Sequence, residues 1–112
     1  MVDLHQLTEQ YVAAFHSRDI NGVAALLAES FTLTDPAVTC LGPRQNVLEY
    51  IQELFTNNPS LHFEAHKILV DAPHSALHFA ITLDGKTYDG VDMITWVDGR
   101  MTRMDAYLTA RA

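Results

Sequence analysis

The sequence predicts an α+β domain in which three N-terminal helices pack on a curved, mainly antiparallel sheet and form a cone with a pocket. Two observations carry this prediction. Between residues 4 and 57 the apolar residues recur at spacings of three and four, which is typical of helices. From Leu61 onward they alternate as in strands, and two Asp-Gly pairs divide the alternation. A chain of 112 residues fits one domain, which we take as residues 1–112.

The first helix is predicted to begin after Asp3 and to end near residues 17–19. Asp3 followed by Gln6 suits a helix N-terminus, because their side chains can bond the free backbone N–H groups there. The apolar face of this helix consists of Leu4, Leu7, Tyr11, Ala14 and Phe15. A shorter second helix is predicted over residues 20–28. Together the two helices supply the first apolar surface of the expected core.

The segment FTLTDPAVTC interrupts the helical spacing with β-branched residues and Pro36. Within it, residues 33–38 (LTDPAV) are predicted to form a short strand. Pro43 suits the first turn of a third helix, which should stop at Asn57 and Asn58, just before a further proline. The apolar positions of this helix are Val47, Leu48, Ile51, Leu54 and Phe55.

Four long strands follow, and turn signals mark their ends. Ala72-Pro73 separates the first two strands, while Asp84-Gly85 and Asp98-Gly99 are both strong signals for two-residue hairpins. The predicted antiparallel meander therefore covers residues 61–70, 74–83, 86–97 and 100–109. With Ala72-Pro73 as the turn, His78 is expected to pair near Lys67.

The composition is that of an acidic protein with enough apolar material for a core. Hydrophobic residues make up 48% of the chain, and 14 acidic against 7 basic side chains give a formal net charge of −7. Such a surface repels nucleic acid and anionic membranes, so neither is expected as a partner. The N-terminus has no signal-peptide pattern, and no apolar run is long enough to span a bilayer. We therefore expect a cytoplasmic protein.

Three polar residues stand in apolar surroundings. Asp35 precedes a proline, where a turn aspartate is the first interpretation. Tyr11 lies on the apolar face of the first helix, where its hydroxyl needs a partner that a core backbone carbonyl could supply. Asp92 shares a strand face with Ile94 and Trp96, where an ionised, dry carboxylate is costly. Either that face is partly wet, or burial raises the pKa of Asp92 and favours the neutral acid.

Asp35, Tyr11 and Asp92 belong to three separate elements that can meet inside a cone. A carboxylate there can abstract a proton from a bound molecule. A phenol and a desolvated carboxyl group can donate hydrogen bonds to an oxygen that gains charge. If the three share one pocket, the set predicts proton-transfer chemistry.

The order of the elements, together with EQYVAAF, HSRDINGVAALLAESF, LTDPAV and GVDMITWVDGRMTRMDAYL, resembles the nuclear-transport-factor-2-like (NTF2-like) superfamily, and within it the SnoaL-like and ketosteroid-isomerase-like branch. The resemblance covers roughly residues 3–109. It implies a cystatin-like fold, a homodimer through the sheet, and catalysis without a cofactor. In ketosteroid isomerases an Asp after the second helix is the base, and a helix Tyr and a strand Asp kept neutral by an apolar site are oxyanion donors. The matching residues here are Asp35, Tyr11 and Asp92.

Further positions bear on the resemblance. Ketosteroid isomerases often carry a supporting tyrosine on the third helix, where this chain has Gln52. Tyr50, two residues earlier, is expected to point about 200° away from that position. Epoxide hydrolases of this fold have a different pattern, with an Arg two residues before the strand Asp. In this chain that position is Gly90, so the activating cation is missing.

Two further groups of titratable residues are candidates for acid–base chemistry or metal binding. Asp105 is expected to form a surface pair with Arg103, although Asp105 or Asp92 remains open as the acid–base residue of a polyketide cyclase. His62 and His66 share a strand face but would lie about 13 Å apart, which is too far for one metal ion. No metal site is therefore predicted.

Two kinds of function fit these residues. The first is a ketosteroid-isomerase-like proton-transfer isomerase acting on a hydrophobic, steroid-like unsaturated ketone. Asp35 would be its base, while Tyr11 and protonated Asp92 would stabilise the charged oxygen. The alternative is a SnoaL-like small-molecule binding protein or a polyketide-cyclase-like enzyme of unassigned activity. In each case the residues expected to line a pocket for a small hydrophobic ligand are Phe15, Leu54, Phe55, Ile94 and Trp96.

Overall fold

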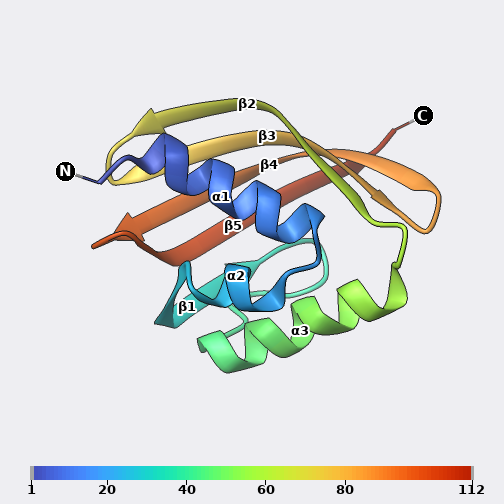
Figure 1. Cartoon of the computed structure of the whole chain (residues 1–112), viewed down its shortest axis with the longest axis horizontal. Helices are drawn as coiled ribbons and strands as arrows, with labels where there is room; N and C mark the ends of the chain where they lie inside the picture. Colours follow the sequence, from blue (N-terminus) through green and yellow to red (C-terminus); the bar gives the residue numbers. More distant parts are fainter. Residues whose placement is uncertain (1, 112) are drawn as a thin grey trace.

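The structure, a computed structural model, describes residues 2–111, in which three helices and five strands are found (Figure 1). The helices are α1 (Leu4–His16), α2 (Ile20–Ala24) and α3 (Arg44–Asn57). The strands are β1 (Leu27–Thr34), β2 (His62–Asp71), β3 (His74–Leu83), β4 (Lys86–Val97) and β5 (Arg100–Ala110). Among these residues, none of the helices has the length and apolar character needed to cross a membrane.

The strands form one curved sheet in the order β1-β5-β4-β3-β2 (Figure 1). β2, β3, β4 and β5 make the antiparallel meander that the sequence predicts. β1 lies at the edge of the sheet and runs parallel to β5, with Leu33 beside Met104. α1 packs across β2 and β3, whereas α3 packs on β1. The predicted α+β architecture of helices on a curved sheet is confirmed.

The second helix and the strand after it differ from the prediction. α2 ends at Ala24 rather than at residue 28, because β1 already begins at Leu27. The backbone N–H of Met101 donates to the carbonyl of Leu26 at 2.7 Å, so the start of this strand is fixed by a distant part of the chain. Local spacing cannot reveal such a pairing, because the apolar residues involved fit a helix face equally well.

The predicted strand over residues 33–38 is correct only for its first two residues, since β1 ends at Thr34. From Asp35 the chain turns, and the backbone N–H of Asp35 donates to the carbonyl of Val38 at 2.9 Å. Pro36 has no N–H group with which to continue a strand ladder. The Asp-Pro pair therefore sets the end of β1, and Asp35 lies in the turn that follows.

The turn signals of the meander are confirmed. Asp84-Gly85 has φ angles of 50° and 77°, and Asp98-Gly99 has φ angles of 51° and 78°. Positive φ at both central residues is the geometry of the type I′ turn that suits two-residue hairpins. Lys67 pairs with His78 across β2 and β3, as the position of the first turn predicts.

The two faces of the sheet differ in character. On β4, alternate residues are buried toward the helices, namely Gly90, Asp92, Ile94 and Trp96. On the opposite, outer face Met93 is 43% exposed, and Tyr107 of β5 is 63% exposed. The homodimer implied by the family resemblance would use this outer face, and that dimer stays a prediction.

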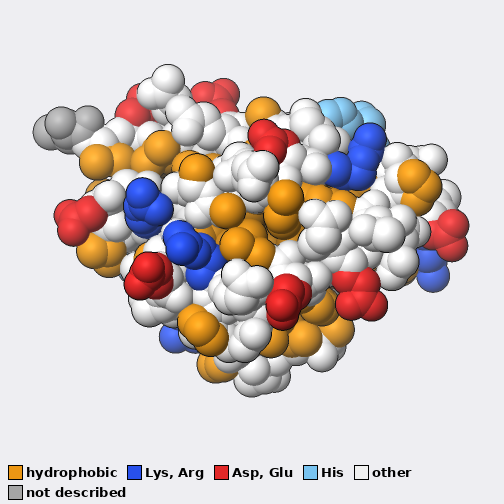
Figure 2. Space-filling view, turned by 60° about the horizontal axis from the view of Figure 1, so that its bottom comes forward, with side chains coloured by type: hydrophobic (Ala, Val, Ile, Leu, Met, Phe, Trp, Pro, Cys, Tyr) orange, Lys and Arg blue, Asp and Glu red, His pale blue; other side chains and the backbone are white. Residues whose placement is uncertain are grey.

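Charged side chains of both signs are interspersed on the surface seen in Figure 2, around hydrophobic side chains that gather near its middle. The net charge of −7 is therefore not concentrated in one acidic patch on this face. Opposite charges this close together largely cancel at longer range, so the face offers no broad electrostatic steering of a charged partner.

A chain of buried polar groups joins α1 to the sheet. Trp96 Nε1 donates to Ser75 Oγ at 2.9 Å, and the hydroxyls of Ser75 and Thr8 lie 3.0 Å apart. Thr8 also donates to the carbonyl of Leu4 at 2.7 Å. The side chains of Thr8, Ser75 and Trp96 are at most 3% exposed, so their polar groups depend on protein partners for hydrogen bonds. The network holds α1 against β3 and β4.

We expect Ser75→Ala to lower the free energy of unfolding by about 1–3 kcal/mol, because Trp96 Nε1 would lose its acceptor inside the core. Urea denaturation followed by tryptophan fluorescence measures this change, since Trp96 is the single tryptophan of the chain. Ser30→Ala removes the same hydroxyl from an exposed position of β1 and serves as the control. Equal free energies of unfolding for the two variants would contradict the role of the network.

Candidate active site

A cavity of about 150 Å³ lies between the helices and the inner face of the sheet. Most of its lining is apolar and comes from every layer of the fold. Only four of the lining side chains carry a polar group, and these are Tyr11, Asp35, Tyr50 and Asp92. The three residues that the sequence nominated as catalytic therefore surround one cavity, together with a second tyrosine.

Tyr11 extends from the buried face of α1 and is 5% exposed. Its hydroxyl donates to Met104 Sδ at 3.9 Å, and a thioether sulfur is a weak acceptor. Burial, and then the charge of Asp92, raise the pKa of Tyr11 well above its ordinary value. The phenol therefore keeps its proton and remains able to donate a stronger hydrogen bond to a ligand oxygen.

Asp92 lies on the inner face of β4, between Leu77 of β3 and Ala106 of β5, and is 3% exposed. Its carboxyl group makes no hydrogen bond to any other residue in the range 2–111. Burial, and then the charge of Asp35, raise the pKa of Asp92 to about 8. At neutral pH the group is therefore mainly an uncharged acid whose O–H has no protein acceptor.

The carboxylate of Asp35 is held by three donors. Oδ1 accepts from the backbone N–H groups of Ala37 at 2.8 Å and Val38 at 2.9 Å, which is the hydrogen bonding of an Asx turn. Oδ2 accepts from the hydroxyl of Tyr50 at 2.8 Å. Asp35 therefore lies in a turn and also borders the cavity, because one oxygen organises the turn and the other binds a side chain of the cavity wall.

Tyr50 and Gln52 lie on different sides of α3, as predicted, but Tyr50 and not Gln52 lines the cavity. Burial, the hydrogen bond to Asp35 and the charge of Asp35, in that order, raise the pKa of Tyr50 to about 12. Tyr50 lies three residues after Val47 and four before Leu54, so it borders the apolar face of α3. Gln52 points elsewhere and donates to Thr56 at 3.3 Å on the exposed side of the helix. The spacing of Tyr50 from Val47 and Leu54 was the sequence signal that could have placed this residue at the cavity.

Three of the five predicted wall residues lie outside the cavity. Phe15 and Leu54 line it, but Phe55, Ile94 and Trp96 do not. Phe55 is buried against Phe15, with ring centroids 5.0 Å apart. Ile94 and Trp96 share a face with Asp92, but each step of two residues moves about 7 Å along a strand. They fill the core beyond the cavity, where Trp96 joins the hydrogen-bonded network with α1.

Further aromatic side chains of the cavity wall come from β2 and β3, where the sequence predicted no pocket residue. Phe63 of β2 and Phe79 of β3 both line it. Their ring centroids lie 4.8 Å apart, and both side chains are almost completely buried. Each occupies a position on the inward-facing side of its strand, so the alternation that predicts the strands also marked these residues.

Gly90 lies two residues before Asp92 and carries no side chain for a structural reason. A Cβ atom there would lie 2.5 Å from the carbonyl oxygen of Tyr107 and 2.7 Å from Phe79 Cζ. No larger residue fits without moving the neighbouring strand. The cation expected there in the epoxide hydrolase pattern has no place in this site.

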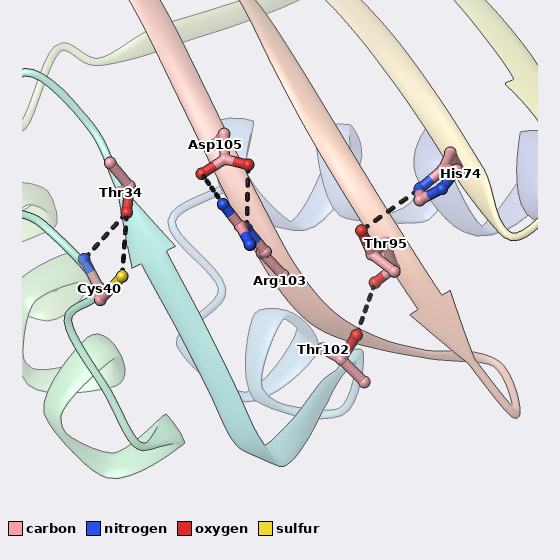
Figure 3. Close-up of polar contacts among 7 residues, drawn as sticks. All are labelled: Thr34, Cys40, His74, Thr95, Thr102, Arg103 and Asp105. Atoms are coloured by element: carbon pink, nitrogen blue, oxygen red, sulfur yellow. Dashed lines mark hydrogen bonds and ion pairs between the residues drawn. The ribbon is translucent and has the colours of Figure 1, made fainter.

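Asp105 is paired with Arg103 at 3.1 Å on β5 (Figure 3), as the sequence predicts. It is not among the residues that line the cavity. Of the two carboxyl groups left open as the acid–base residue of a cyclase, only Asp92 therefore borders the cavity. In the part of the chain that the structure describes, no group of three or more His, Cys, Asp or Glu side chains is arranged to hold a metal ion.

The raised pKa of Asp92 should make the folded protein less stable as pH rises, because this carboxyl group ionises more readily in the unfolded state. Its folded-state pKa of about 8 exceeds the unfolded value of about 3.9, so the folded state binds more protons between these pH values. The favourable contribution is complete below about pH 4 and is lost as pH rises through about 8.

We therefore expect Asp92→Asn, which cannot ionise, to gain at least about 1 kcal/mol in free energy of unfolding relative to wild type between pH 5 and pH 8. Urea denaturation at both pH values measures the change, with Asp105→Asn as the control at a carboxyl group outside the cavity. A constant difference between Asp92→Asn and wild type at the two pH values would contradict the buried, neutral state of Asp92.

Solved structures share this fold. An NTF2-like protein of unknown function from Cytophaga hutchinsonii gives a TM-score of 0.84 at 16% identity, with 97% of this chain and 92% of that chain covered. A proposed ketosteroid isomerase from Kribbella flavida gives 0.85 at 24% identity, with 96% and 78% covered. An LEH-like epoxide hydrolase from M. tuberculosis gives 0.80 at 14% identity, with 93% and 80% covered. At these identities the similarity shows the fold alone.

No curated protein matches the sequence. The SnoaL-like domain family matches residues 8–104, which include Tyr11, Asp35, Tyr50 and Asp92. That range is most of the chain, and the neighbouring structures have the same NTF2-like fold. The chain therefore belongs to the SnoaL-like domain family.

Proposed function

We propose that this protein is a cofactor-independent isomerase that moves a double bond in a hydrophobic β,γ-unsaturated ketone by proton transfer. One observation carries the proposal: two carboxyl groups in different states share one apolar cavity. Three donors hold Asp35 as an acceptor, whereas Asp92 has no partner in the described chain and stays largely uncharged at neutral pH. Titratable groups whose surroundings give them different states are typical of acid–base sites.

The reaction begins with proton abstraction by Asp35. Oδ2 takes a proton from the carbon between the carbonyl group and the double bond, and the electron pair moves to the carbonyl oxygen to give a dienolate. Asp35 then returns the same proton to the far carbon of the original double bond, and the carbonyl group re-forms in conjugation with the new one. The carbonyl group accepts the electron pair throughout, so the reaction needs no cofactor.

Tyr11 and Asp92 would stabilise the dienolate oxygen. Both carry an O–H group, and neither spends it on a strong acceptor within the described chain. Because the surrounding wall is mainly apolar, a hydrogen bond to an oxygen that gains charge is worth more there than in water. An ionised Asp92 would instead repel the dienolate, so its raised pKa suits this role.

Tyr50 would act as a positioning residue for the base. A carboxylate oxygen has two lone pairs, so Oδ2 can keep its hydrogen bond from Tyr50 and still accept a proton. The bonds from Ala37 and Val38 hold the other oxygen against the turn. Both carboxylate oxygens of Asp35 are thus held in place before a substrate enters, which lowers the entropic cost of the reaction.

We expect Asp35→Asn to reduce kcat by about 10²–10⁴-fold with little change in KM, because the amide cannot accept the proton. Ultraviolet absorbance follows the reaction, since the double bond moves into conjugation. Both cyclohex-3-enone and a β,γ-unsaturated 3-oxosteroid should be tried as substrates. Asp105→Asn is the matched control, because this carboxyl group pairs with Arg103 away from the cavity. If wild type turns over neither ketone above buffer, the isomerase proposal fails and a non-catalytic binding protein becomes the better explanation.

The same site predicts an alkaline limit to activity. As pH rises above about 8, Asp92 loses the proton that it would donate to the dienolate, so kcat/KM should fall. In Asp92→Asn the amide keeps a donor and cannot ionise, so we expect lower activity without the fall near this pH. A pH profile of kcat/KM for both proteins checks this, and an unchanged alkaline limb in the variant would assign that limb to another group.

A further inference from the structure

We propose that the substrate is a ketone with a single ring, and that the cavity does not enclose a four-ring steroid. This inference rests on the proposed function, and it narrows the steroid-like ketone that the sequence led us to expect. It is carried by the volume of the cavity, by the packing of its aromatic wall and by one phenylalanine, Phe79, that lines the same cavity as Asp92.

The volume of the cavity matches one ring. It measures about 150 Å³. An engineered apolar cavity of about this volume accommodates benzene, whereas pockets for drug-sized ligands span about 300–1,000 Å³. A six-membered enone ring with its carbonyl oxygen is therefore near the upper size that this cavity can enclose.

The aromatic wall leaves little freedom to enlarge the cavity. The ring centroids of Phe15 and Phe63 lie 4.9 Å apart, and those of Phe63 and Phe79 lie 4.8 Å apart. Tyr11 meets Phe63 edge to face at 6.1 Å. All four side chains are at most 6% exposed. Rings packed in this way cannot swing aside without losing contacts on several sides, so the wall resists a larger ligand.

Phe79 limits the space in the cavity that Tyr11 and Asp92 also border. It pairs with Gly90 across β3 and β4, and its Cζ lies 2.7 Å from where a Cβ of Gly90 would be. The ring therefore covers the inner face of β4 two residues before Asp92. The missing side chain at Gly90 does not widen the cavity, because Phe79 occupies that space. Phe79 and Asp92 line the same cavity, so a ligand with a second ring would compete with the Phe79 ring for the same small space.

Substitution of Phe79 should therefore change the size of substrate accepted and leave the acid–base groups in place. In wild type we expect kcat/KM for cyclohex-3-enone to exceed that for a β,γ-unsaturated 3-oxosteroid by at least about tenfold. Phe79→Ala should reduce this ratio by at least about tenfold, since it opens volume in the cavity. Phe79→Leu is the milder variant if alanine prevents folding. Phe55→Ala, an equally buried phenylalanine outside the cavity, should leave the ratio unchanged. A wild-type preference for the steroid would overturn the proposal.

A binding measurement separates this proposal from the proposed function. Phenol and a four-ring phenolic steroid both offer a hydroxyl to Tyr11 and Asp92, and neither needs turnover. By calorimetry we expect phenol to bind wild type, the steroid to bind no more tightly, and the steroid to gain at least about tenfold in affinity in Phe79→Leu. Tighter binding of the steroid by wild type, or no binding of phenol, would overturn the single-ring inference. The expected binding without turnover of either ketone would support the size limit and reject the isomerase.

Discussion

The burial of the Asp92 carboxyl group is the constraint on which the rest of the site depends. A carboxyl group on the inner face of β4, 3% exposed, avoids the cost of a dry charge by keeping its proton, so burial raises its pKa to about 8. The curved sheet brings Leu77 and Ala106 to either side of it, and the helices close over the same face. Those layers remove water from Asp92 and Tyr11 together, which leaves two donors directed at one small, apolar cavity.

The carboxyl group of Asp35 has the opposite surroundings, because several hydrogen-bond donors bind it. It lies where β1 ends, and backbone N–H groups of its own turn bind one oxygen while Tyr50 binds the other. Two acidic side chains around one cavity thus differ in burial and in hydrogen-bond partners, although they have the same functional group. The charge of Asp35 contributes to the raised pKa of Asp92, and the charge of Asp92 contributes to that of Tyr11, so the three groups respond to one another. Residues of the same types scattered over a surface would have no such coupling.

Much of the fold could be predicted because its signals are local. The N–H of Gln6 donates to Asp3 Oδ1 at 3.1 Å, as expected at the start of the first helix. The two Asp-Gly pairs adopt the positive φ angles of type I′ turns, and the turn at Ala72-Pro73 places Lys67 beside His78. Alternation on β4 likewise placed Asp92 on the same face of the strand as Ile94 and Trp96. Each inference uses only residues within one helix, one strand or one hairpin, where backbone geometry fixes the outcome.

By itself the sequence therefore determined the order and type of most elements, the hairpin turns and the inward direction of Tyr11 and Asp92. Only the tertiary structure decided the parallel pairing of β1 with β5, the contact of Tyr50 with Asp35 and the depth at which the cavity ends. Strand alternation tells which face Ile94 and Trp96 share with Asp92, but not how far along that face the helices leave space. The reason is physical: periodicity fixes direction about an axis, whereas cavity boundaries depend on side chains from distant segments that pack against one another.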